Sequence, residues 1–105
     1  MIVKSDHAQK RELRGMRFEV LAAGERSMII RVPCKAGDRV ARHSHPHEQT
    51  GYVVSGKVRL TTGGSAETLE AGDSYSIPGN APHSLDVLED AVVLDFFTPR
   101  RDDYL

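Results

Sequence analysis

The chain is interrupted at short intervals by turn residues, and this punctuation constrains its fold more than any other feature. From about Phe18 onward, short apolar or alternating runs are separated by segments such as AGD, SG, GG, PGNAP and ED. The runs are FEVLAA, SMIIRV, TGYVVS, KVRLTT, AETLE, DSYSIP, SLDVL and AVVLDFF. Each has the length of a strand rather than a helix. Strands without covering helices must bury their faces against one another, so we expect an all-β sandwich, jelly roll or small closed barrel.

The length sets the number of domains. A chain of 105 residues, 39% of them hydrophobic, is long enough to bury one core and too short for two. We therefore expect a single domain over residues 16–105, preceded by a charged arm of residues 1–15. Only residues 8–13 of this arm are compatible with a helical period.

The charge pattern and the cysteine content limit which partners and which cellular compartment we expect. The 14 Lys and Arg and 15 Asp and Glu give a formal net charge of -1, and the cations are scattered, so we expect no nucleic-acid partner. No segment reads as a signal peptide or a membrane span. Cys34 is the only cysteine, which fits a reducing compartment. We expect a cytoplasmic protein in which Cys34 is a small strand hydrophobe rather than a nucleophile.

The segment HSHPHEQ concentrates side chains that can bind a metal. His43 and His45 are two residues apart, so on an extended strand both imidazoles point to the same face. Gln49 keeps this parity and offers a carbonyl oxygen as a third ligand, whereas Glu48 would face outward. His83, in the turn PGNAPHSL, is a candidate fourth ligand from across the barrel. This grouping predicts a metal site.

The proposed ligands are all neutral, which affects the chemistry of the site. Isolated histidines are usually surface or hydrogen-bonded residues, and we expect this ordinary role for His7 and His47. Three imidazoles and the amide of Gln49 leave the charge of a divalent ion uncompensated, which favours an anionic, oxygen-rich ligand and a lowered pKa of bound water. Such a set departs from the carboxylate-containing triad of non-haem iron oxygenases. Imidazole suits Zn, Ni, Fe and Cu, and Mn stays open.

A single carboxylate interrupts the apolar run AVVLDFF near the C-terminus. Asp95 is expected in apolar surroundings, where an unpaired charge is costly. It is either bonded to a turn amide or an arginine, or a general acid/base with a raised pKa. Phe97 shares its parity and is a candidate apolar wall of the same cavity. Arg100 and Arg101 are either a solvated pair or a clamp for a carboxylate.

These segments resemble the two motifs of the cupin superfamily. The first resembling set surrounds the histidine pair: Gly37, His43, His45, Gln49 and Gly56. The second lies in the later turn: Gly72, Pro78, Asn80 and His83. The family has Glu where this chain has Gln49, more often has Gly at the position of Asn80, and often has Asn at the position of Val87. The 15 residues between the motifs match the short spacing of small single-domain microbial cupins.

The resemblance implies both a fold and a cofactor. The fold would be the cupin β-barrel, a double-stranded β-helix or jelly roll. A divalent metal, Zn, Ni, Fe or Mn, would be held by His43, His45, Gln49 and His83. A homodimer is also expected, because a barrel of this size leaves sheet edges or an apolar outer face.

Together with VLDFFTPRRDDYL, the motifs resemble the pectin-degradation group of small cupins, which linearise 4,5-unsaturated uronates. The resemblance implies conversion of a cyclic unsaturated monouronate, released from pectin or alginate, to its open-chain keto form. The partner would be a small anionic sugar acid, with catalytic or substrate contacts at Asp95, Phe97 and Arg101. Two other functions stay open: a metal-dependent dioxygenase or other redox cupin acting on a small organic substrate, and a non-catalytic cupin that binds a small molecule.

Overall fold

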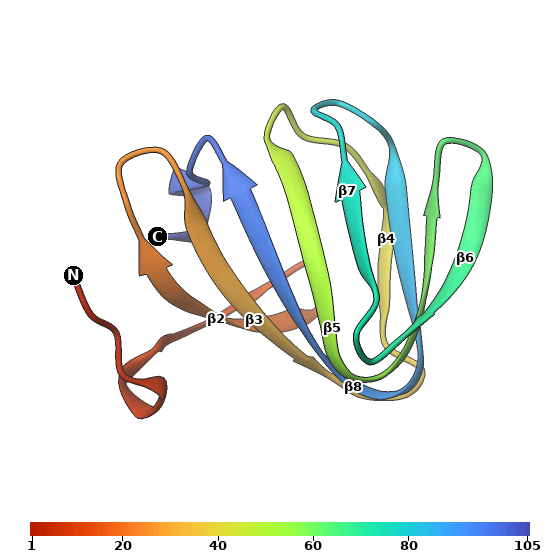
Figure 1. The fold of residues 1–105 in the computed structure, drawn as a ribbon, viewed down its shortest axis with the longest axis horizontal. Coiled ribbons are helices and arrows are strands. Elements are labelled where there is room, and N and C mark those ends of the chain that lie inside the picture. Colours follow the sequence, from red (N-terminus) through yellow and green to blue (C-terminus); the bar gives the residue numbers. More distant parts are fainter.

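The computed structural model describes all residues, 1–105, as one domain that is almost entirely β (Figure 1). Eight strands form one connected antiparallel sheet, and two short 3-10 helices lie near the chain ends. The strands are β1 (Gln9–Leu13), β2 (Met16–Ala23), β3 (Met28–Cys34), β4 (Arg39–His43), β5 (Glu48–Thr62), β6 (Ser65–Glu70), β7 (Ser74–Ile77) and β8 (His83–Thr98). The helices are η1 (Ser5–His7) and η2 (Asp102–Tyr104). The expected all-β class and single domain are confirmed.

Two long strands, β5 and β8, fold the sheet over on itself. Residues 48–55 of β5 pair with residues 92–98 of β8, and β7 and β3 flank this part. Residues 57–62 of β5 pair with residues 83–89 of β8, and β6 and β4 flank that part. Figure 1 shows the resulting U-shaped arrangement, in which the two parts face each other. The inner faces of both parts enclose the core.

Alternate side chains of adjacent strands fill this core. Residues with the same parity point to the same face, so every second residue of β2, β3, β5 and β8 lies inside. The largest fully buried side chains are Phe97, Met28, Ile77, Val53, Val58 and Val93. The core therefore comes from the apolar runs that were recognised in the sequence.

Two turn signals lie inside strands rather than between them. β5 continues through Gly56, and β8 continues through Glu89 and Asp90. The register of the β5–β8 ladder shifts at this point, as at a β-bulge. The expected strand ends here were wrong, because a bulge lets one long strand bend and serve both parts of the sheet.

The N-terminal segment contributes a strand. Residues 9–13 form β1, which pairs with β2 in a hairpin, so the helical period considered for residues 8–13 was wrong. Arg14 and Gly15 at the hairpin tip have φ of 53° and 79°, which is typical of a tight two-residue hairpin turn. The charged residues of β1 suit an exposed edge strand. A boundary between arm and domain at residue 15 stays a prediction.

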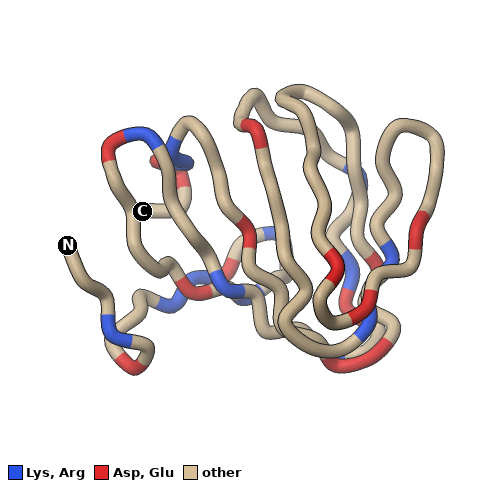
Figure 2. The backbone as a smooth tube through the Cα atoms, viewed as in Figure 1, with Lys and Arg blue, Asp and Glu red and all other residues tan.

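Charged side chains of both signs are distributed along the strands and turns. Figure 2 shows Lys and Arg interspersed with Asp and Glu. Lys57, for example, lies 3.1 Å from a carboxylate oxygen of Glu89 and 3.4 Å from one of Glu70. None of the helices has the length and apolar character required to cross a bilayer.

We expect Gly56→Ala to destabilise the fold more than Gly64→Ala. Both glycines have a left-handed φ, 83° and 82°, which costs a residue with a Cβ about 1–2 kcal/mol. A Cβ on Gly56 would overlap the backbone of Asp90 and Ala91, whereas a Cβ on Gly64 would meet no atom within 4 Å. Overpacking adds about 1–3 kcal/mol at Gly56 alone. Urea denaturation of both variants measures the difference in free energy of unfolding. Equal losses of stability in the two variants would contradict a close approach of β5 to β8 at Gly56.

Candidate metal centre

Three histidines from two sequence segments converge at one end of the barrel. His43 ends β4, His83 begins β8, and these two residues are paired in register. His45 lies in the loop between β4 and β5, so it reaches the cluster from a loop rather than from an extended strand. The ring nitrogens of the three residues that face one another lie within 4.8 Å. The two sequence motifs therefore meet in space.

Backbone carbonyls determine which nitrogen of each ring is free. The Nδ1 atoms of His43, His45 and His83 lie 2.9, 3.0 and 2.8 Å from carbonyl oxygens two residues away in the sequence. A carbonyl only accepts hydrogen bonds, so each Nδ1 carries the proton and each Nε2 presents a lone pair. Backbone partners of this kind commonly orient histidines that ligate metals.

The free nitrogens of the cluster have the properties of metal ligands. The Nε2 atom of His83 is buried and has no hydrogen-bond partner. Burial lowers the pKa of His43 below its ordinary value and that of His45 to about 4, so both imidazoles are neutral at pH 7. Neutral imidazoles with converging lone pairs fit a divalent metal ion.

Gln49 lies beside the histidines, on the inward face of β5. Its Oε1 atom is 3.1 Å from Nε2 of His45. Because Nδ1 of His45 carries the proton, the two facing atoms are both acceptors and repel each other. A cation that binds both atoms would remove this repulsion. The donor set therefore fits the expected four-residue ligand set, with Gln49 as the oxygen donor.

Asp95 is buried next to Gln49 and is held through one oxygen. Its Oδ1 accepts hydrogen bonds from Nε2 of Gln49, at 3.0 Å, and from the hydroxyl of Tyr75. Its Oδ2 has no protein partner and is not sealed from solvent. Burial raises the pKa of the Asp95 carboxyl. Neither a turn amide nor an arginine holds this carboxylate, and the second oxygen is free for a ligand.

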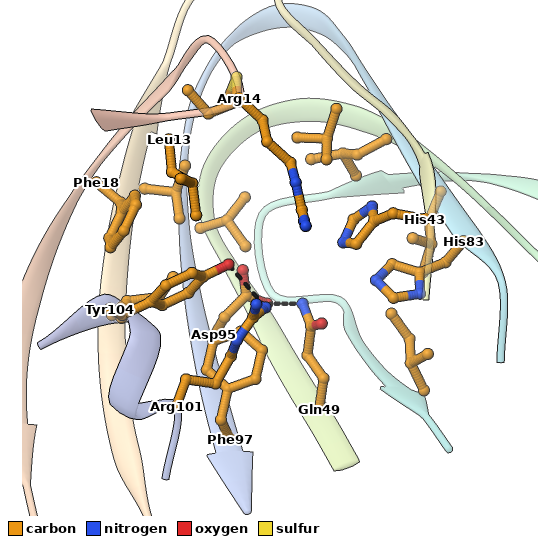
Figure 3. A pocket seen from close by; sticks show the side chains of 18 of the residues that line it. Leu13, Arg14, Phe18, His43, Gln49, His83, Asp95, Phe97, Arg101 and Tyr104 are labelled. Atoms are coloured by element: carbon orange, nitrogen blue, oxygen red, sulfur yellow. Dashed lines mark hydrogen bonds between the residues drawn. The ribbon is translucent and has the colours of Figure 1, made fainter. Parts of the chain in front are cut away.

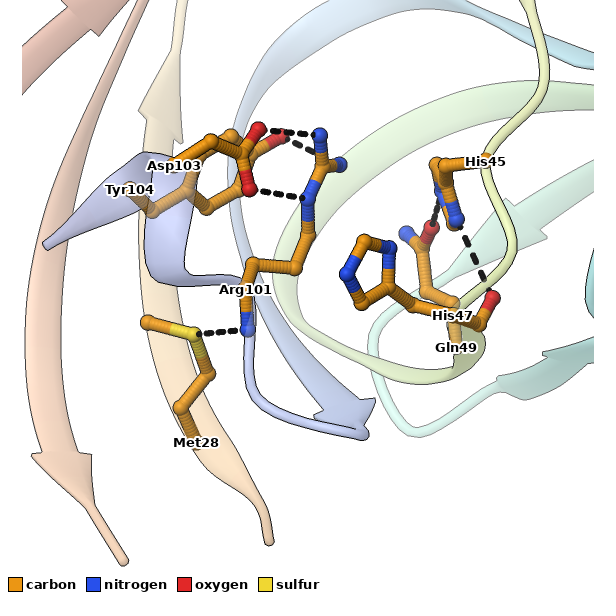
Figure 4. A network of polar contacts seen from close by, with 7 residues as sticks. All are labelled: Met28, His45, His47, Gln49, Arg101, Asp103 and Tyr104. Carbon is orange, nitrogen blue, oxygen red and sulfur yellow. Dashed lines mark hydrogen bonds and ion pairs between the residues drawn. The ribbon is translucent and has the colours of Figure 1, made fainter. Parts of the chain in front are cut away.

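Arg101 lies directly after β8 and is only 3% exposed. Its guanidinium donates to both carboxylate oxygens of Asp103, at 3.3 and 2.7 Å, and to the hydroxyl of Tyr104, at 2.8 Å (Figure 4). It also stacks over the rings of Tyr104 and Phe97, with its central carbon 4.0 and 5.3 Å from their centroids. Three of its five N–H groups are thus used, and two remain for a ligand.

One cavity of about 90 Å³ brings these groups together. Most of its wall is apolar, and Figure 3 shows the polar groups that project into it. The previously expected residues in this wall are His43, Gln49, His83, Asp95, Phe97 and Arg101. The structure therefore places the predicted catalytic residues in the same cavity as three of the four predicted ligands, and His45 contacts it through Gln49.

Arg14 and Tyr75, which also line this cavity, were not predicted from the sequence. Arg14, at the tip of the β1–β2 hairpin, extends between His43 and Tyr104 toward the cavity, and no protein group pairs with its guanidinium (Figure 3). Nothing in its local sequence indicates this position, which depends on the pairing of β1 with β2. Tyr75 could have been found, because it shares inward parity with Ile77 and a buried tyrosine hydroxyl needs a partner.

The other reactive side chains lie outside the site. Cys34 is buried, and burial raises the pKa of its thiol to about 11, so it is an unreactive strand residue. Glu48 is exposed, as its parity predicts, and His7 is exposed in η1. His47 packs near Phe97, with 6.5 Å between ring centroids, and is not part of the histidine cluster. Arg100 pairs with Asp102 at 2.8 Å.

Comparisons with known proteins agree with this site. The chain is 29% identical to the pectin degradation protein KdgF of Dickeya dadantii (strain 3937) over 93 residues, which are 87% of this chain and 84% of the relative. The solved structure of KdgF from Halomonas sp. has a TM-score of 0.90 and 29% identity, and the match covers 98% of this chain and 96% of that one. These two matches confirm the expected resemblance to the pectin-degradation group.

The family assignment rests on a model that matches more than half of the chain. An RmlC-like cupin from Shewanella frigidimarina NCIMB 400 has the same fold, with a TM-score of 0.92 at 24% identity over 99% of this chain and 95% of that one. The family model described as a cupin domain matches residues 31–97, which span both histidine motifs and Asp95. The chain therefore belongs to the cupin family.

Proposed function

We propose that this cupin is a metal-dependent enzyme of pectin or alginate breakdown that converts cyclic 4,5-unsaturated monouronates to linear keto forms. The observation that carries the proposal is the presence, in one cavity, of a buried carboxylate, Asp95, with metal-binding side chains and two cations, Arg14 and Arg101. The relatives named KdgF support the assignment to pectin degradation.

The proposed ligands of a divalent metal, Zn, Ni, Fe or Mn, are His43, His45, Gln49 and His83. Their Nε2 lone pairs and the Gln49 oxygen supply no negative charge. When bound, the metal would act as a Lewis acid toward oxygen atoms of the substrate. This preference for oxygen-rich anions matches a sugar acid.

The reaction is an isomerisation, so it needs no oxidant or reductant. The hemiacetal hydroxyl of the sugar loses its proton, and the bond between the anomeric carbon and the ring oxygen breaks. The hemiacetal oxygen becomes an aldehyde oxygen, the ring oxygen becomes a ketone oxygen on the alkene carbon to which it is bonded, and the other alkene carbon gains a proton. The free Oδ2 of Asp95 accepts the first proton and returns it to that other alkene carbon. The raised pKa of this buried carboxyl favours both steps near neutral pH.

The remaining residues orient the substrate. The two free N–H groups of Arg101 donate to the substrate carboxylate, and Arg14 adds a second cation from the hairpin. Phe97 forms an apolar wall that limits access of water to the reacting carbons. Ionised Asp103 and stacking keep the Arg101 guanidinium in place.

We also propose that the enzyme is a cytoplasmic homodimer. The buried, unpaired Cys34 is compatible with a reducing compartment. The outer face of the β5–β8 region carries apolar side chains that no element of the chain covers fully, among them Val54, Leu94 and Phe96. A second copy of the chain would bury this face.

Incubation with an unsaturated galacturonate tests the activity. The metal-loaded protein is expected to accelerate the loss of the ultraviolet absorbance of the conjugated alkene, and a chelator is expected to abolish this effect. Asp95→Asn should lower kcat by about 10²–10⁴-fold, the usual contribution of a positioned acid/base. Absence of acceleration over the spontaneous rate would overturn the proposal.

Two further measurements separate the alternative functions. Activity under anaerobic conditions would exclude the redox alternative. An Asp95→Ala variant that keeps metal and loses no function would favour a binding protein.

Arg14→Gln tests the recognition of the substrate carboxylate. Loss of one charge-assisted hydrogen bond, about 1.5 kcal/mol, should raise KM roughly tenfold. Arg17→Gln is the matched control, because Arg17 is a nearby exposed arginine that pairs only with Glu12, at 3.9 Å. KM is measured for the free acid and for its methyl ester. An unchanged KM for the free acid, or an equal rise for the ester, would contradict a role of Arg14 in binding the substrate carboxylate.

Light scattering after size-exclusion chromatography tests the dimer. The expected mass is twice the 11.6 kDa of one chain. Val54→Asp should halve it, because a charge in a buried apolar interface is strongly unfavourable. Glu67→Gln, at an exposed position of β6, is the control and should leave the mass unchanged. A wild-type mass of one chain would contradict the proposed assembly.

A further inference from the structure

We propose that Tyr75 is a positioning residue that acts through Asp95 to hold the amide of Gln49 with its oxygen toward the histidines. The inference rests on the metal centre of the proposed function. It goes beyond that centre by assigning a role to a residue that is not itself one of the proposed ligands.

An amide ligand has an orientation problem that a carboxylate ligand does not have. The two ends of the Gln49 amide are nearly equal in shape, but one is an acceptor and the other a double donor. Only the orientation with Oε1 toward His45 offers a lone pair to a cation. Some neighbouring group must select this orientation, because the flipped amide would direct N–H groups at the metal.

Asp95 is the group that selects it. Its Oδ1 accepts the hydrogen bond from Nε2 of Gln49 at 3.0 Å. A flipped amide would place its oxygen against this carboxylate oxygen and lose the bond. Oδ1 remains an acceptor even when a proton resides on Oδ2, so the selection does not depend on the protonation of Asp95.

Tyr75 holds Asp95 in the orientation that this selection requires. Its hydroxyl donates to the same Oδ1 atom. Its ring occupies a slot on β5 that exists because residue 51 is glycine: a Cβ on Gly51 would overlap the ring of Tyr75, its cross-strand partner. Without the hydroxyl, the carboxylate is free to rotate and the amide loses its fixed partner.

Tyr75→Phe separates this role from simple packing, because phenylalanine keeps the ring in the slot and removes only the hydroxyl. Tyr52→Phe is the matched control: Tyr52 is the neighbouring residue of Gly51, points to the outer face, is 43% exposed and has no side-chain hydrogen bond. Co²⁺ is titrated into metal-free protein, and its visible absorption reports affinity and coordination without any substrate.

Tyr75→Phe is expected to weaken Co²⁺ binding about tenfold, the lower end of the effect of removing an outer partner of a metal site. Its Co²⁺ spectrum should shift toward that of Gln49→Ala, because the amide oxygen is no longer held at the metal. Tyr52→Phe should change neither quantity. An affinity and spectrum of Tyr75→Phe equal to those of the unaltered protein would overturn the inference.

A double-mutant cycle with Gln49→Ala identifies the route of the effect. If Tyr75 acts through the amide, Tyr75→Phe has no further effect once Gln49 is alanine. An equal loss in both backgrounds would mean a packing effect and would also overturn the inference. The side-chain NH₂ signals of Gln49 in ¹⁵N spectra give a second measurement, since they should move in Tyr75→Phe. Failure of the unaltered protein to bind Co²⁺ would instead reject the proposed metal centre itself.

Discussion

The pairing of β5 with β8 is the interaction on which the rest of the structure depends. It places Gln49 opposite Phe97 and Gly51 opposite Asp95, so residues nearly fifty positions apart line one cavity. The same pairing continues beyond the bend at Gly56, where it sets the position of His83 relative to β5. A sheet that did not bend at this point would separate the paired residues His43 and His83 from Gln49 and Asp95. The bent pairing of β5 with β8 therefore brings the metal-binding groups and the buried carboxylate together.

The cavity has an unusual balance of charge. The imidazole of His43 and the amide of Gln49 are neutral, the only carboxylate in the wall is buried, and the cations are arginines. Arg101 is neutralised in part by Asp103, whereas Arg14 has no partner. This division leaves one arginine fixed as part of the wall and one available at the mouth. An anionic ligand would complete the electrostatics of the site, which is the physical reason that a sugar acid is a better fit than a neutral substrate.

Much of the site was predictable because its residues follow local rules. Parity placed His43 and Gln49 on the inner face and Glu48 on the outer one, and the apolar neighbours of Asp95 indicated its burial. Two other predictions were wrong for different reasons. Gly56 marks a bend within a strand rather than its end. Residues 9–13, for which a helical period was considered, form an edge strand whose stability comes from pairing with β2 rather than from its own sequence.

The sequence by itself determined the position of most apolar strand segments, the side chains able to bind a metal, and the presence of one carboxylate in an apolar run. These properties depend on neighbours a few residues away. Only the tertiary structure decided that Tyr75 contacts Asp95, that Arg101 donates hydrogen bonds to Asp103, and that Arg14 reaches the cavity from the hairpin. The physical reason is that strand pairing and sheet bending, which no local pattern encodes, bring these side chains within hydrogen-bonding distance of one another or into the same cavity.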